Sequence, residues 1–237
     1  MVKKKIRNAV KKEIKKHPKR STLTIILLFT LAIAFVGALN QQNWVSILFI
    51  IVISFLIFLP MTIGKVSHIE IPIQLEIFSV LFIYATLFLG ELKNYYAKFT
   101  WWDTVLHTAS GLAFGIIGFI ILYVMYKSEK IKTSPKTIAI FTFAFALAIG
   151  ALWEIVEFII DSNLGSISNG VSMQGSLKDT MWDLIVDSIG GLFSAVMGYL
   201  YLKKDSGVVI KHMTKEFKKG NPRLFKTKGN KIKKGHN

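Results

Sequence analysis

The chain contains no cysteine. Disulfides, thiolate metal ligands and cysteine redox chemistry are therefore excluded as sources of stability or activity. Arginine is scarce, because only Arg7, Arg20 and Arg223 occur, and all three lie in the terminal segments. A lipid phosphatase with a histidine nucleophile would need arginines around the phosphate, so this class is disfavoured. Of five histidines, only His107 falls within a predicted membrane helix.

Apolar and basic residues are both abundant. Hydrophobic residues make up 52% of the 237 residues, while 30 lysines and arginines against 14 acidic residues give a net charge of +16. One protein can combine these properties only if the two kinds of residue are segregated along the chain. The basic residues gather in residues 1–20, in short loops and after residue 202. This distribution indicates a multi-pass membrane protein and no partner nucleic acid.

Six apolar runs are each close to the ~20 residues that a spanning helix needs. We therefore predict an all-α membrane protein with six transmembrane helices, at about residues 22–39, 44–64, 71–90, 104–126, 137–160 and 181–202. These helices form one predicted transmembrane domain, residues 21–202. A basic N-terminal segment, residues 1–20, precedes it, and a basic tail, residues 203–237, follows it.

The basic residues also predict the orientation in the membrane. On this scheme 27 of them lie on the side of the two termini and three lie on the opposite side. The positive-inside rule then places the N- and C-termini in the cytoplasm, in a protein of the cell (cytoplasmic) membrane. Residues 1–20 are expected to be either an amphipathic helix on anionic lipid at the cytoplasmic face or a solvated basic tail. A signal peptide is disfavoured by the length of the first apolar run, and the oligomeric state is open.

Each of the last three predicted helices carries a stripe of acidic residues next to small residues. Residues four apart lie on one face of a helix. The stripes consist of Asp103, His107, Gly111 and Gly115; of Ala146, Gly150, Glu154, Glu157 and Asp161; and of Asp179, Asp183, Asp187, Gly190, Gly191, Ser194 and Gly198. The topology places the polar half of each stripe in the outer leaflet, and helix rise puts His107, Glu154 and Asp187 at similar depths. The small residues predict close helix packing below this layer.

Seven carboxylates in these stripes face one lysine, Lys178, and one imidazole. Unpaired like charges this close cannot all stay ionised. A divalent metal (Mn²⁺, Zn²⁺, Fe²⁺ or Mg²⁺) would balance them, with no other cofactor expected. The alternatives are protonated acids that hydrogen-bond between helices, or an ion or proton pathway. The predicted catalytic residues are Asp103, His107, Glu154, Glu157, Asp183 and Asp187; the metal ligands are His107, Asp103, Glu154, Glu157 and Asp183; and the rim residues are Asp161, Gln174 and Asp179.

The sequence also predicts the position of one further acidic residue and the role of one loop. Glu76 on the third predicted helix is expected to reach the interface near Lys65 or His68, with half of a proton path as the alternative. The loop from Asp161 to Lys178 is rich in Gly, Ser and Asn. It is expected to be a flexible lid over the outer ends of the last two helices.

An ordered set of motifs between Leu89 and Gly198 resembles the YjdF-like family of uncharacterised bacterial inner-membrane proteins. The resemblance rests on DTVLHTASG (103–111), EIVEF (154–158), and QG (174–175) leading into DTMWD (179–183). It implies a membrane location and no particular reaction. A looser similarity to VanZ-like proteins implies a role at the cell envelope.

These patterns favour a divalent-metal-dependent enzyme or binding protein for an envelope or lipid-linked substrate. A cation or proton transporter is the first alternative, and it requires polar groups along the whole path. A structural membrane protein with a polar helix-packing network is the second. The sequence patterns do not decide whether the protein is an enzyme.

Overall fold

The computed structural model describes residues 14–15, 17–164 and 175–226. Every regular element in these residues is a helix. Six helices are long and apolar enough to cross a membrane: Pro18–Asn40, Trp44–Val66, Ile73–Leu92, Trp102–Lys127, Pro135–Ser162 and Leu177–Lys204. The predicted all-α fold with six potential spans is therefore confirmed, while the orientation of the termini stays a prediction. Most of the expected N-terminal amphipathic helix (residues 1–20), most of the expected lid and Gln174 lie outside the described residues.

The chain divides into two compact units, Met1–Lys98 (unit 1) and Phe99–Asn237 (unit 2). Each unit contains three of the six potential spans. The predicted division into a basic N-terminal segment, one transmembrane domain over residues 21–202 and a basic tail stays a prediction.

Unit 1 is formed by α2 (Pro18–Asn40), α3 (Trp44–Leu56), α4 (Leu59–Val66), α5 (Ile73–Ile83), the π-helix η1 (Tyr84–Leu92) and the short α6 (Tyr95–Lys98). The second span is broken between α3 and α4, where Pro60 occupies the first turn of α4. Proline is tolerated there because the first turn of a helix has no partner for its backbone N–H. At the start of α3, the side chain of Asn43 accepts a hydrogen bond from the backbone N–H of Ser46 and caps the helix.

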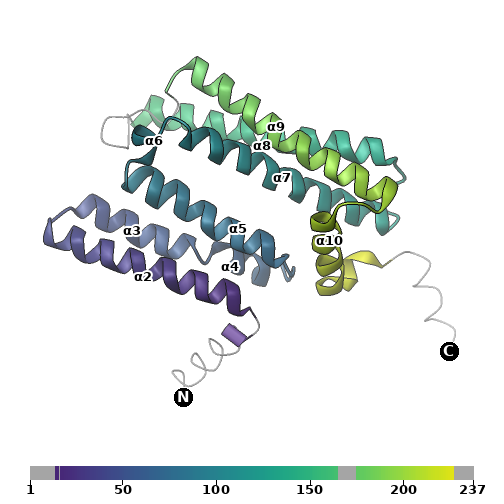
Figure 1. Ribbon diagram of the computed structural model, residues 1–237, viewed down its shortest axis with the longest axis horizontal. Coiled ribbons are helices and arrows are strands. Elements are labelled where there is room, and N and C mark those ends of the chain that lie inside the picture. The colour runs from purple at the N-terminus through teal and green to yellow at the C-terminus, as the bar shows by residue number, and fades with distance from the viewer. Residues whose placement is uncertain (1–13, 16, 165–174, 227–237) are drawn as a thin grey trace. The chain divides into compact units, whose positions relative to one another are not determined.

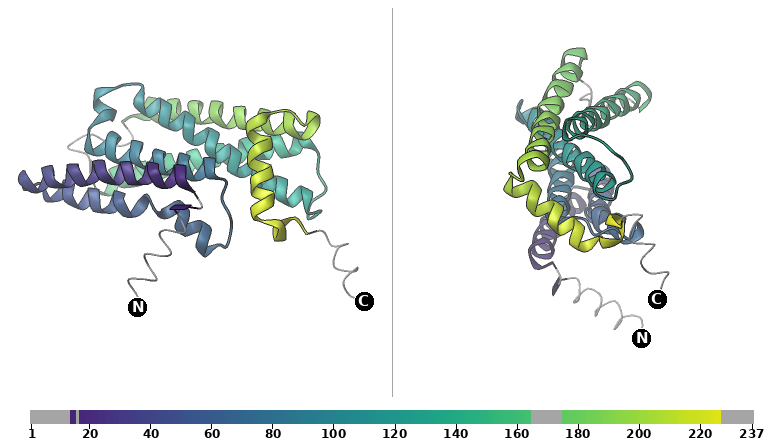
Figure 2. Two further views of the ribbon diagram at one scale, coloured as in Figure 1. Left: turned by 60° about the horizontal axis from the view of Figure 1, so that its bottom comes forward. Right: turned by 90° about the vertical axis from the view of Figure 1, so that its right-hand side faces the viewer.

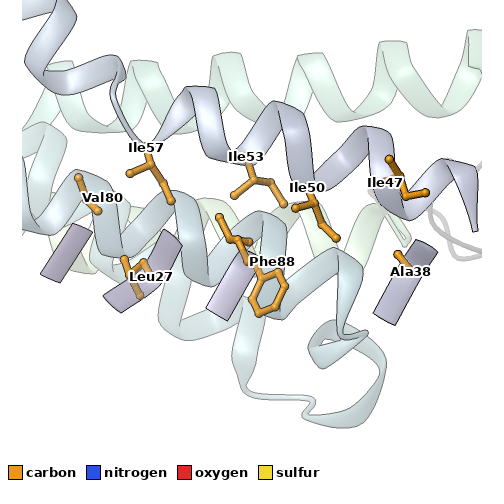
Figure 3. Packing of buried hydrophobic residues seen from close by; sticks show 9 residues of the cluster. Leu27, Ala38, Ile47, Ile50, Ile53, Ile57, Val80 and Phe88 are labelled. Atoms are coloured by element: carbon orange, nitrogen blue, oxygen red, sulfur yellow. The ribbon is translucent and has the colours of Figure 1, made fainter. Parts of the chain in front are cut away.

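The core of unit 1 lies between α2, α3 and the continuous α5–η1 helix. Side chains such as Leu27, Ile50, Ile53 and Phe88 are buried and point toward one another (Figure 3). The opposite faces carry exposed large apolar side chains, such as Phe55 at 76% exposure. An exposed apolar surface of this kind on a helix of spanning length is expected where the helix meets lipid.

The carboxylate of Glu76 forms a buried ion pair with Arg20, which the sequence analysis did not predict. The Nη1 atom of Arg20 donates to Oε2 of Glu76 at 2.5 Å, and both residues are buried. Lys65 lines the same cavity as Glu76, but Arg20 forms the ion pair, because α2 begins at Pro18, four residues before the predicted start, and Arg20 lies in its first turn. A buried carboxylate needs a counter-charge, and the neighbouring helix supplies it.

Unit 2 is built on α7 (Trp102–Lys127), α8 (Pro135–Leu164) and α9 (Leu177–Lys204), which contact one another pairwise and lie side by side in Figure 1. Glycines set the distance between α7 and α9. A Cβ atom on Gly111 would collide with the backbone of Asp187, and one on Gly190 would collide with the carbonyl oxygen of Thr108. The close helix packing predicted from the small residues is confirmed at these positions.

A further helix, α10 (Val208–Gly220), crosses the ends of α7 and α9 (Figure 2), and the 3₁₀ helix η2 (Pro222–Phe225) follows it. The chain turns sharply between α9 and α10 through Asp205 and Gly207, both with positive φ. Ile210, Met213 and Phe217 are buried, while the lysines of α10 are exposed. The sequence analysis missed this helix, although apolar residues three and four apart in the basic tail were a signal for it.

Candidate functional site

Helix α7 contributes Asp103 and His107 to a cluster of acidic residues inside unit 2. Asp103 lies in the first turn, where the helix dipole favours a negative charge. His107 follows one turn later and is only 6% exposed. Its Nε2 atom lies 3.7 Å from Oδ1 of Asp103. The four-residue spacing therefore brings the two side chains together on one face, as the sequence predicted.

Helix α9 contributes Asp183 and Asp187, which are 3% and 1% exposed. Oδ2 of Asp187 lies 3.2 Å from Nδ1 of His107, and Oδ1 accepts a hydrogen bond from the hydroxyl of Ser110 at 2.9 Å. An ionised carboxylate can only accept, so this contact is satisfied when the imidazole carries its proton on Nδ1. The lone pair of Nε2 then faces the remaining acids.

Two glycines make room for Asp187 between the three helices. A Cβ atom on Gly150 of α8 would collide with the carboxylate of Asp187, and one on Gly111 of α7 would collide with its backbone. Any larger residue at either position would displace α9 or the carboxylate. The small residues next to the acids therefore allow one acid to be fully buried, in addition to closing the helix packing.

Helix α8 contributes Glu154 and Glu157. Glu154 is 4% exposed, and its Oε1 atom lies 3.9 Å from Nε2 of His107. Neither carboxylate oxygen of Glu154 forms a hydrogen bond of normal geometry with a described residue, although the hydroxyl of Thr180, which also lacks a partner of normal geometry, lies close to it. By contrast, Glu157 accepts a hydrogen bond from Nε1 of Trp153 at 2.8 Å. A buried carboxylate without a hydrogen bond is costly, so the position of Glu154 calls for a charged partner.

Three residues meet the distance requirement for holding one ion. Asp103, His107 and Asp183 each offer a ligand atom, and these atoms all lie within 4.8 Å of one another. The Nε2 atom of His107 is common to the contacts with Asp103 and Glu154. One nitrogen and several carboxylate oxygens suit Mn²⁺, Fe²⁺, Zn²⁺ or Mg²⁺ better than a soft metal. The contact between Asp187 and Nδ1 matches the carboxylate–histidine–metal arrangement that orients histidine ligands.

The other predicted site residues lie at the edge of this cluster or beyond it. Asp161 is half-buried near the end of α8, and Asp179 lies in the first turn of α9, with its carboxylate next to Gly175. Neither belongs to the group whose ligand atoms lie within 4.8 Å of one another.

Two residues with a place in the site were missed by the sequence analysis. Ser110 follows His107 by three residues, and this spacing could have indicated that it shares the face of the acids. Trp182 donates from Nε1 to the hydroxyl of Thr104 at 3.1 Å and ties α9 to α7 beside the cluster.

The fold and the cluster define a multi-pass helical membrane protein with buried acids around one histidine. Residues 20–204 match the family described as "Predicted membrane protein (DUF2238)", and the chain belongs to this family. The predicted resemblance to the YjdF-like family is thereby confirmed. An uncharacterised protein of Thermotoga maritima is 30% identical over 135 residues, which cover 56% of this chain and 66%, just under two thirds, of that relative. No solved structure matches the chain.

Proposed function

We propose that unit 2 holds a divalent metal ion and uses it to bind or transform an envelope or lipid-linked substrate. The single observation that carries this proposal is Glu154. Its carboxylate is buried and forms no hydrogen bond of normal geometry with a described residue, and it lies beside a triad whose ligand atoms lie within 4.8 Å of one another. One cation would offset the charge of several carboxylates at once and remove the cost of burying them unpaired.

The roles of the residues follow from their contacts. Asp103, Asp183 and Nε2 of His107 are the proposed ligands, and Glu154 is the proposed fourth. Asp187 holds the imidazole through Nδ1 and is itself held by Ser110, so it is a positioning residue.

In this proposal Glu157 keeps its predicted catalytic role but not its predicted role as a metal ligand. Its Oε1 atom accepts from Trp153, so it is proposed to transfer protons and not to be a primary ligand. A divalent ion bound here would polarise a carbonyl or phosphoryl oxygen, or lower the pKa of a bound water.

The predicted topology supports a substrate that arrives from the outer leaflet. Asp103 is the second residue of α7 and Asp179 the third of α9, and both helices start on the side that carries three of the basic residues. Trp101 and Trp182 are exposed near the same helix ends, as expected for side chains at a membrane interface. An amphiphile anchored in that leaflet would present its head group at the depth of the cluster.

The transporter alternative is less well supported. It requires polar groups that continue toward the other side, and the candidate for this half was Glu76, whose carboxylate pairs with Arg20. Beyond Asp187, the contact between α7 and α9 is made by Gly111, Gly115 and Ser194 at close range. Close backbone packing of this kind leaves little room for a hydrated path.

The test is elemental analysis of the purified full-length protein after growth in metal-replete medium. We expect about one divalent ion per chain, and we expect His107→Ala and Asp183→Asn to lose it. Asp205→Asn is the matched control, because Asp205 is an exposed acid beyond the end of α9 and pairs with Lys211. Wild-type protein that folds without any bound ion would contradict the proposal and favour a hydrogen-bonded polar network.

A further inference from the structure

Unit 1 contains a cavity that is lined by both charged and apolar side chains. This cavity of about 380 Å³ opens between α2, α4 and α5, and the buried ion pair of Arg20 and Glu76 lines it. The same lining includes the exposed Lys65 and, deeper along the helices, Leu28, Ile57 and Val80. This volume falls within the range of small-molecule pockets in proteins, about 300 to 1,000 Å³.

The polar groups gather at one end of the cavity. Arg20 lies in the first turn of α2, Lys65 near the end of α4, and Glu76 in the first turn of α5. Because α2 and α5 run in the direction opposite to α4, these three positions lie on the same side of the membrane. The apolar lining residues are one or two turns further into the span. A cavity with charged groups at one end and apolar side chains along the rest of its lining matches an amphiphile.

The charged residues that line the cavity indicate which charge a bound head group would have. Among the described residues, two cationic side chains and one carboxylate line the cavity, so that Lys65 adds a positive charge to the pair of Arg20 and Glu76. A basic pocket between membrane helices near the cytoplasmic face is the usual setting for an anionic lipid head group. By the predicted topology, the charged end of the cavity lies at that leaflet.

We propose that this cavity binds one anionic phospholipid, with its phosphate at Lys65 and Arg20 and an acyl chain along Leu28, Ile57 and Val80. If the ion pair of Arg20 and Glu76 served only to hold α2 and α5 together, neither a cavity nor a further lysine would be needed beside it. The cavity and Lys65 are the two features that this structural role does not explain. The site is independent of the acid and histidine cluster, which lies in unit 2.

The experiment compares lipids on the full-length protein in detergent. The thermal unfolding temperature is measured with phosphatidylglycerol, with phosphatidylcholine of the same chains, and with inorganic phosphate, while native mass spectrometry counts bound lipids. We expect phosphatidylglycerol to stabilise most, one molecule to remain bound, and inorganic phosphate to have no effect. Lys65→Gln should weaken phosphatidylglycerol binding about fivefold, the effect of one basic residue near a lipid surface, and leave the response to phosphatidylcholine unchanged.

Lys130→Gln is the matched control, because Lys130 is exposed on the same predicted side and does not line the cavity. Thr24→Phe, which fills the cavity from α2, should remove the retained lipid; if that variant does not fold, Lys65→Gln decides the question alone. Equal stabilisation by the two lipids would overturn the proposal. So would equal losses in Lys65→Gln and Lys130→Gln, which would indicate only general surface charge, or a response to inorganic phosphate equal to that of the lipid.

Discussion

The Nδ1 atom of His107 lies 3.2 Å from Oδ2 of Asp187, and this contact joins α7 to α9 inside the candidate site. Asp187 reaches this position because Gly150 and Gly111 present no side chain where its carboxylate and backbone lie. The imidazole is thereby oriented with Nε2 toward Asp103 and Glu154. One buried carboxylate therefore sets the direction of the only histidine in the membrane-spanning segments.

Asp187→Asn tests whether this carboxylate positions a metal ligand. Because loss of such a partner typically weakens metal affinity, we expect a 10- to 100-fold rise in the metal dissociation constant with the fold retained. The constant is measured by competition with a chelator of known affinity. Ser110→Ala, which removes one hydrogen bond to Asp187, should change it less. An unchanged dissociation constant in Asp187→Asn would assign Asp187 to helix packing alone.

Gly111→Ala tests the close contact of α7 and α9. The added Cβ atom meets the backbone of Asp187, which cannot move away as a flexible side chain could. We expect a loss of about 1 to 3 kcal/mol in stability from overpacking, seen as a lower thermal unfolding temperature in detergent. Gly37→Ala is the matched control, because a Cβ atom there meets nothing within 4 Å. Equal effects of the two substitutions would contradict the proposed role of Gly111.

The ion pair of Arg20 and Glu76 is suited to a double-mutant cycle. Arg20→Met or Glu76→Gln alone leaves one buried group without its partner, which typically costs about 3 to 5 kcal/mol. The double variant leaves no unpaired buried charge, so its loss of stability should be smaller than the sum of the two single losses. Thermal unfolding of the four proteins gives the coupling energy. Additive losses would mean that the two side chains do not interact in the membrane.

The absence of cysteine gives a clean test of orientation. Single substitutions Lys178→Cys and Lys132→Cys replace exposed lysines on opposite predicted sides of the membrane, without background thiols. An impermeant thiol reagent applied to intact cells should label the first from outside, and should label the second only after the cells are opened. The reverse pattern would place the cluster on the cytoplasmic side and remove the argument for an envelope substrate.

Measurements of cation and proton flux across liposomes distinguish a closed metal site from a transport path. Liposomes containing the wild-type protein should hold cation and proton gradients, because the helix contact beyond Asp187 is closed by small residues. Asp183→Asn should remain folded and lose metal, since an amide is a poor replacement for a carboxylate ligand. A wild-type flux that Asp183→Asn and Glu76→Gln both abolish would instead establish the transporter alternative.

The six helices and the candidate residues could be predicted from the sequence because both depend on local properties. The length of an apolar run decides whether a helix can span a bilayer, and four-residue spacing decides which side chains share a face. Asp103 and His107 illustrate this, since they are one turn apart on α7 and meet in the structure. The glycines after His107 predicted close packing for the same reason.

Only the tertiary structure decided which of the aligned acids meet. Asp179, Asp183 and Asp187 are equivalent in the sequence pattern, yet only Asp187 contacts Nδ1 of His107 and only Asp183 joins the group with Asp103. Which acid meets His107 depends on the rotation and depth of α9 relative to α7 and α8. Close contact at Gly111 and Gly150 sets this position of α9. Likewise, the pairing of Glu76 with Arg20, 56 residues away on another helix, could not be predicted, because no local sequence pattern specifies how two helices face each other.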